Sequence, residues 1–181
     1  MSAVMTPTSD ITFQSANIEI LEQLRHGISG LDNDQYNWRF NAAHSSVGKH
    51  ARHIIDHYLC FFKGSTLAGI HYDTRSRDEE IETNRIRAID ALLNCEQRLY
   101  DLGPHKGPHT DQGRVTVYIS THTDAAAVAT DSSIERELVF LQAHTIHHMA
   151  IMRLLFDLQS IIVPDQFGTS PSTLKMEQCH D

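Results

Sequence analysis

Histidine is the residue type whose number and spacing in this sequence could do chemistry. The chain has 13 histidines, and some recur at intervals of three or four residues. They form two groups: His50, His53 and His57 in the run GKHARHIIDHY, and His144, His147 and His148 in AHTIHHMA. In a helix of 3.6 residues per turn, such spacings place side chains on one face. Each segment, if helical, therefore presents a row of imidazoles.

The pair His144 and His148 is predicted to lie on the core side of its helix. It shares a row with Leu141, Ile151 and Leu155, so two imidazoles stand where leucines would be expected. A buried polar group without a partner costs roughly 1–3 kcal/mol, and neighbouring imidazolium ions repel one another. A divalent metal ion removes both costs, because it binds the lone pairs of neutral imidazoles.

An i, i+4 histidine pair with a third histidine from another helix is a common way to build a metal site with open positions. Nitrogen ligands suit zinc, nickel, iron or copper without selecting among them. From the residues alone, His50, His53 and His57 all remain candidates for the third ligand. The alternative is that these are ordinary core or surface histidines with ordinary hydrogen bonds.

Other histidine-based metal motifs fit less well. HExxH needs a glutamate after its first histidine, and that position is Thr145. Ferritin-like di-iron sites need repeated ExxH segments, and the one ExxH, from Glu177 to His180, lies in the irregular tail. A hemerythrin-like di-iron site stays open as an alternative, with His53 and His57 as a second HxxxH and Asp56 or Glu137 near by.

Four helices are predicted to position these residues. Apolar residues recur at helical spacing over four segments, and capping residues mark the start of three of them. The segments are Ser15–Ile28, one that follows Ser45 or Ser46 and ends near Phe62, one from the Ser76–Glu79 capping box to Gly103-Pro104, and one from the Ser132–Glu135 box to Leu158. Together they indicate an all-α four-helix bundle with one long crossover.

The connections are predicted from composition and alternation. Residues 31–43 form a long connection, and the tail 164–181 lacks periodicity. Val115–Ile119 alternates as a half-buried strand does, and Ala125–Thr130 could return as its partner, giving a short β-hairpin before the last helix. At 181 residues, the chain 1–181 is expected to be a single domain.

Charge and cysteine usage narrow the function classes. The net charge of −8 argues against binding to nucleic acid or anionic lipid. We find no signal peptide and no apolar run long enough to span a bilayer. Cys60, Cys95 and Cys179 include no CxxC, and this pattern suits reduced thiols, with Cys179 exposed in the tail. A cytoplasmic protein without nucleic-acid or membrane partners is expected.

The sequence resembles the DinB-like, or YfiT-like, family of bacterial proteins. The match comprises His53-Ile54-Ile55-Asp56 on the second predicted helix and the HxxxH of His144 and His148 on the fourth. The flanking stretches SSVGKHARHIIDHY, YDTRSRDEEIE, ERELVFLQAHTIHH and FGTSPSTL also resemble a subgroup of that family, and they span roughly residues 45 to 174.

The resemblance implies an up-down-down-up four-helix bundle, commonly a homodimer. It also implies a metal ion on three histidines at one end of the bundle, which carry over to His53, His144 and His148. His50 and His57 are extra to the family pattern, so either could replace His53 or support the ligands. Family members of known activity are metal-dependent and often act on thiols, by thiol transfer to an electrophile, isomerisation or hydrolysis.

Our hypothesis is a metal-dependent hydrolase or thiol transferase acting on a small molecule, in some cases with a low-molecular-weight thiol. The metal would lower the pKa of a bound water or thiol. Further residues could take part: Asp56, Glu137, His147 and His57 in proton transfer, and Arg75 and Arg77 in binding an anionic substrate. The competing hypothesis is a non-catalytic metal-binding or sensing bundle.

Overall fold

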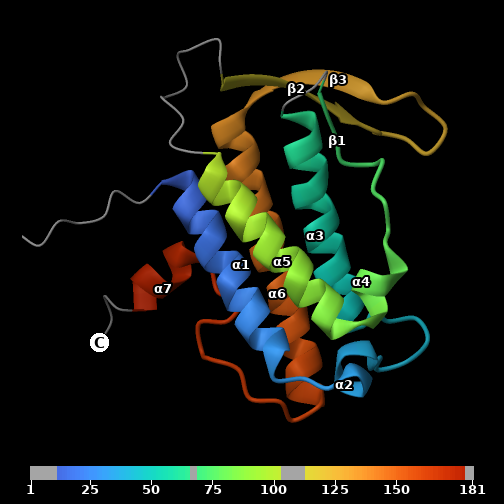
Figure 1. The fold of residues 1–181 in the computed structure, drawn as a ribbon, viewed down its shortest axis with the longest axis vertical. Helices are drawn as coiled ribbons and strands as arrows, with labels where there is room; N and C mark the ends of the chain where they lie inside the picture. The colour runs from blue at the N-terminus through green and yellow to red at the C-terminus, as the bar shows by residue number, and fades with distance from the viewer. Residues whose placement is uncertain (1–11, 66–68, 103–112, 178–181) are drawn as a thin grey trace, which may run out of the picture.

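Four long helices form the body of the protein. The computed structural model describes residues 12–65, 69–102 and 113–177. The long helices are α1 Phe13–Ser29, α3 Val47–Gly64, α5 Arg85–Asp101 and α6 Ile134–Leu158. Both α1 and α3 contact α5 and α6. In Figure 1, α1 and α6 run in one direction and α3 and α5 in the other. The predicted four-helix bundle with up-down-down-up order is therefore confirmed.

A small sheet lies across the end of the bundle where α3 ends and α6 begins (Figure 1). It consists of β1 Ile70–His71, β2 Arg114–Ile119 and β3 Val128–Ser133, in the order β1-β2-β3. β2 pairs with β3 antiparallel and with β1 in parallel. The predicted hairpin is confirmed, although its second strand begins three residues later than the 125–130 expected. The two-residue strand β1 was not predicted.

The third predicted helix is in fact two helices, α4 Glu79–Thr83 and α5. Asp78, not Ser76, caps α4 through its side chain. Asn84 has an extended backbone that ends α4, and its side-chain oxygen accepts the first backbone N–H groups of α5. Asparagine competes in this way for backbone hydrogen bonds, which explains the break. The Ser76 hydroxyl instead donates to Asp56 Oδ1 over 3.1 Å.

Other boundaries also differ from the prediction. Ser133 caps α6 by accepting from the Arg136 N–H, whereas Ser132 donates its hydroxyl to Glu137. The connection 31–43 contains α2 Asn33–Asn37, and the tail contains α7 Pro171–Glu177. The predicted stop at Gly103-Pro104, as well as Cys179 and His180, lies outside the described residues.

The core is packed between the long helices, and a buried polar connection crosses it. The Tyr58 hydroxyl on α3 donates to Asn17 Oδ1 on α1 over 2.7 Å. The Asn17 amide donates in turn to the Leu138 carbonyl on α6 over 3.0 Å. Three of the four long helices are thereby linked through the core. None of the helices in the described part of the chain has the length and apolar character that a bilayer crossing needs.

The crossover from α3 to α5 is held tightly against α3. A Cβ at Gly48 would lie 2.1 Å from the Glu82 carbonyl oxygen, so only glycine permits this approach of α3 and α4. Arg52 on α3 binds the Glu82 carboxylate over 2.9 Å. The Tyr36 hydroxyl of α2 donates to the Ile81 carbonyl over 2.9 Å. These contacts fix α4, at the end of the crossover, against α3 and α2.

Candidate metal centre

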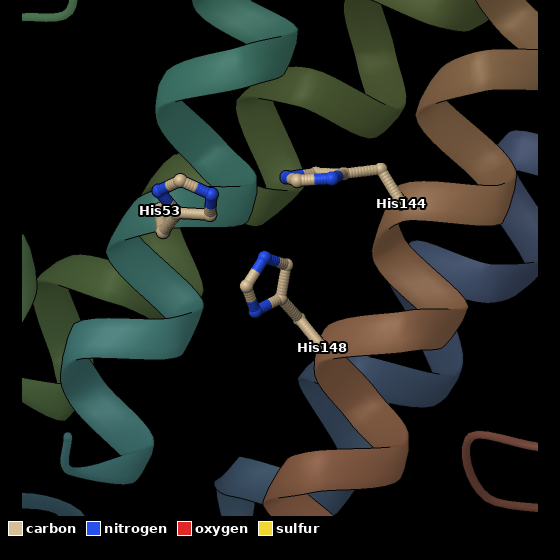
Figure 2. A group of neighbouring side chains, drawn as sticks. All are labelled: His53, His144 and His148. Atoms are coloured by element: carbon tan, nitrogen blue, oxygen red, sulfur yellow. The ribbon is translucent and has the colours of Figure 1, made fainter. Parts of the chain in front are cut away.

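Three histidines from two helices converge in a gap between α3 and α6. His53 projects from α3, and His144 and His148 project from α6, so that the three rings point toward one another (Figure 2). One ligand nitrogen of each lies within 4.8 Å of the others, and all three side chains are half-buried. His144 Nε2 is buried and has no hydrogen-bond partner. Buried polar atoms usually have a partner, and a metal ion bound at this point would supply the one that this nitrogen lacks.

The helices place these rings beside the core rather than within it. The buried row of α6 is Leu138, Leu141, Thr145 and Met149. His144 and His148 each precede a residue of that row by one position, which is a rotation of about 100° around the helix. They therefore face α3 and are half-buried, whereas Leu138 and Leu141 in the buried row are fully buried.

Two further histidines contact the three from either side. His50 Nδ1 lies 3.0 Å from His148 Nδ1, so one of these atoms donates a hydrogen bond to the other. His57 Nδ1 donates to the His53 carbonyl over 2.7 Å. Its Nε2 is consequently an acceptor and faces the Arg75 guanidinium at 3.4 Å. His50 and His57 thus support the three convergent rings.

The environment keeps the three convergent imidazoles neutral. Burial is the largest cause, and together with nearby positive charge it lowers the pKa of His53 to about 2, of His148 to about 3 and of His144 to about 4. The charge comes from the neighbouring imidazoles at all three histidines and also from Arg75 at His53 and His144. Neutral imidazole is the form that binds metal. The donor set therefore fits a divalent ion.

Arg75 and Asp56 lie beside the histidines and are connected through one segment. The Asp56 carboxylate is buried and binds Arg52 over 2.7 Å and Ser76 over 3.1 Å. It thereby anchors the residue next to Arg75, whose guanidinium faces His57. Of the two predicted anion-binding arginines, Arg75 reaches the centre, whereas Arg77 is exposed and has a left-handed backbone with φ 52°.

Glu137 and His147 occupy different surroundings. Glu137 is buried seven residues, about two turns, before His144 on α6, and it accepts hydrogen bonds from Tyr72, Ser132 and Arg136. His147 is exposed, with its ring 5.3 Å from that of His148. The proton-transfer roles suggested for Asp56, Glu137, His57 and His147 stay predictions.

Two aromatic residues of the centre were not singled out from the sequence. The Tyr72 ring stacks on His57 at 5.5 Å, and the Phe140 ring stacks on His144 at 5.5 Å. Phe140 lies four residues before His144, so helical spacing could have indicated it. Tyr72 follows β1 in the crossover, and no periodic signal connects it with α3 or α6.

Comparisons with known proteins agree with this fold. No family model matches the chain. The structure of YfiT from Bacillus subtilis, described as a probable metal-dependent hydrolase with an unusual four-helix bundle topology, matches with a TM-score of 0.59. The match is 17% identical in sequence and covers 87% of this chain and 94% of that one. This chain therefore has the four-helix bundle fold of YfiT, as the resemblance in sequence indicated.

A second similarity is limited to part of the chain. FK506-binding protein 5 from Rhizopus delemar is 26% identical over 106 residues, which is 59% of this chain. The match covers 27% of that protein, so this chain aligns with about a quarter of its length.

Proposed function

We propose that this protein is a metal-dependent hydrolase acting on a small molecule through His53, His144 and His148. The observation that carries the proposal is the convergence of three neutral imidazole nitrogens, one of which has no hydrogen-bond partner. The similarity in fold to YfiT, described as a probable metal-dependent hydrolase, supports the choice of reaction.

The composition of the cluster favours an open centre with one ion. Among the residues that the structure describes, no carboxylate or thiol joins the three histidines. Three protein ligands leave positions for water and substrate, which is typical of catalytic rather than structural zinc. A hemerythrin-like pair of ions would need bridging carboxylates, and both candidates, Asp56 and Glu137, already bind other side chains.

A divalent ion such as zinc, nickel or iron, when bound, would activate water and polarise a carbonyl or similar group. The residues of the chain would contribute orientation and charge. In the tautomer in which His148 Nδ1–H donates to His50 Nδ1, His148 Nε2 has the lone pair that would bind the ion. Arg75 has further N–H groups beside His57 that can bind an anionic part of the substrate.

The metal site is tested by elemental analysis of untagged protein that has not contacted a nickel column. We expect about one divalent ion per chain, and we expect His144→Ala and His148→Ala to lose most of it. His147→Ala is the matched control for metal content, because it removes an exposed imidazole from the same turn. Full metal content in His144→Ala and His148→Ala would contradict the proposal.

The reaction is tested with a panel of small esters and amides, in water alone and with an added low-molecular-weight thiol. Hydrolysis that stops on chelation and returns with metal supports the proposal. Transfer to the thiol in place of water would identify the other reaction expected from the sequence, thiol transfer. Metal-loaded protein without turnover above the free ion would instead indicate a non-catalytic metal-binding bundle.

A further inference from the structure

A cavity of about 180 Å³ lies between the β2–β3 hairpin and the first turns of α6. Its walls include Val117 and Ile119 of β2 and the rings of Tyr72 and Phe140. Thr130 of β3 is exposed at its rim, where it pairs with Val117. Directly paired residues of neighbouring strands point to the same face of a sheet, so Thr130 and Val117 both face the cavity.

One layer of aromatic rings separates this cavity from the histidines. Tyr72 and Phe140 line the cavity and lie 5.1 Å apart, measured between ring centroids. On its other side, Tyr72 stacks on His57, and Phe140 stacks on His144. A group held in the cavity would therefore lie one ring away from the candidate metal ligand His144.

The lining favours an uncharged apolar group. Glu137 is the buried carboxylate of the cavity, and it already accepts hydrogen bonds from Tyr72, Ser132 and Arg136. It therefore has little capacity left to attract a cation. The polar lining residues Ser132 and Arg136 are the donors to Glu137, and Asp131 is exposed to solvent. The other walls are Val117, Ile119 and the rings of Tyr72 and Phe140, on which aromatic rings pack favourably in edge-to-face or offset arrangements.

The size of the cavity points to one ring. Pockets for drug-sized ligands measure roughly 300–1,000 Å³, and this cavity is smaller. An apolar cavity of about 150 Å³ in another protein binds benzene. The volume of about 180 Å³ is thus suited to a single aromatic ring.

We propose that this cavity is a substrate subsite that holds a single aromatic ring against Tyr72 and Phe140, beside the three histidines. The assignment as a substrate subsite rests on the proposed function. The prediction that a ring binds in the cavity does not rest on the proposed function, because the cavity is formed by protein side chains alone. The substrate class is accordingly a small ester, amide or related compound with an aryl group.

The test uses metal-free full-length protein titrated with benzyl alcohol and followed by NMR. We expect saturable binding, with nuclear Overhauser contacts from the probe to the Tyr72 and Phe140 rings. Thr130→Phe should fill the rim of the cavity and weaken binding at least tenfold. Ala129→Phe is the matched control, because Ala129 is also exposed on β3 but points to the opposite face; it should change binding less than twofold.

The affinity for benzyl alcohol is compared only among variants whose circular dichroism and melting temperature match those of the native protein. Absence of saturable binding to the native protein would overturn the proposal. Equal weakening by Thr130→Phe and Ala129→Phe, or probe contacts elsewhere, would also overturn it. Because no metal is present, these outcomes are distinguishable from a failure of the metal-dependent reaction.

Discussion

His50 contacts the candidate ligand His148 through a hydrogen bond between their Nδ1 atoms, 3.0 Å apart. This bond fixes the His148 ring and directs its Nε2 away from His50. Removing a residue that orients a metal ligand typically lowers metal affinity 10- to 100-fold. We therefore expect His50→Ala to weaken zinc binding at least tenfold, measured by competition with a chelator of known affinity. His26→Ala, an exposed histidine on α1, should leave the affinity unchanged; equal affinities for both variants would show that His50 has no orienting role.

The three convergent histidines also make the metal-free protein sensitive to acid. Their folded-state pKa values of about 2 to 4 lie below the ordinary value of 6.5. As the pH falls through 6.5, the unfolded chain takes up protons that the folded protein does not, so stability falls. The contribution is complete above pH 6.5 and is lost progressively as the pH falls toward the folded-state pKa values of about 4 to about 2. Denaturant unfolding of metal-free protein at pH 7.5 and pH 5.0 should show this decrease.

A variant separates the histidine contribution from that of other groups. His53→Gln removes one of the imidazoles with a lowered pKa, so the decrease in stability between pH 7.5 and pH 5.0 should become smaller. His26→Gln removes an exposed imidazole and should leave the decrease as it is in the native protein. The same decrease in all three proteins would contradict the argument.

At the scale of residues, spacing was informative only within a helix. The pair His144 and His148 was predicted from its i, i+4 spacing and its place among apolar residues. The third member, His53, was chosen by resemblance to a family, because spacing alone could not separate it from His50 and His57. The contact between Tyr72 and His57 could not be predicted, since it joins two segments through the tertiary fold.

At the scale of elements, the four long helices could be predicted, but two of their starts could not. Ser76 and Ser132 each begin a capping-box pattern, yet each donates its hydroxyl to a buried carboxylate, Asp56 and Glu137 respectively. These tertiary hydrogen bonds compete with capping, and a local sequence pattern does not reveal them. Ser76 thereby lies next to Asp56 beside the candidate metal centre, whereas Ser132 lies near the start of α6.

Asn84 is the residue that makes two helices of one predicted helix. Its side chain caps α5 by accepting from the Ile86 and Arg87 N–H groups. Replacing an N-cap asparagine with alanine costs about 1 kcal/mol, so Asn84→Ala should lower the free energy of unfolding by about that amount in urea. Asn94→Ala is the control, since Asn94 is exposed in the middle of α5, where alanine has the higher helix propensity. A free energy of unfolding for Asn84→Ala equal to that of the native protein would mean that the break between α4 and α5 does not depend on this cap.

At the scale of the whole molecule, the topology brings the crossover to the centre. Because α3 and α5 run in parallel, the chain must return along the bundle between them (Figure 1). The returning segment carries Tyr72 and Arg75 past His57. The bundle order could be predicted through the family resemblance, but the route of this segment along α3 could not, because it has no periodic pattern.

The connection of α1, α3 and α6 through Tyr58 gives a prediction for the molecule as a unit. In Tyr58→Phe, Asn17 Oδ1 loses the hydroxyl that donates to it over 2.7 Å, and both residues are buried. A buried acceptor left without a donor costs about 1–3 kcal/mol. We expect a loss of that size in urea unfolding with an unchanged m-value, because the same surface is exposed on unfolding. Tyr100→Phe, at a residue that is 75% exposed, should stay within about 0.5 kcal/mol of the native protein. Equal stabilities of the two variants would mean that the polar connection does not hold the three helices together.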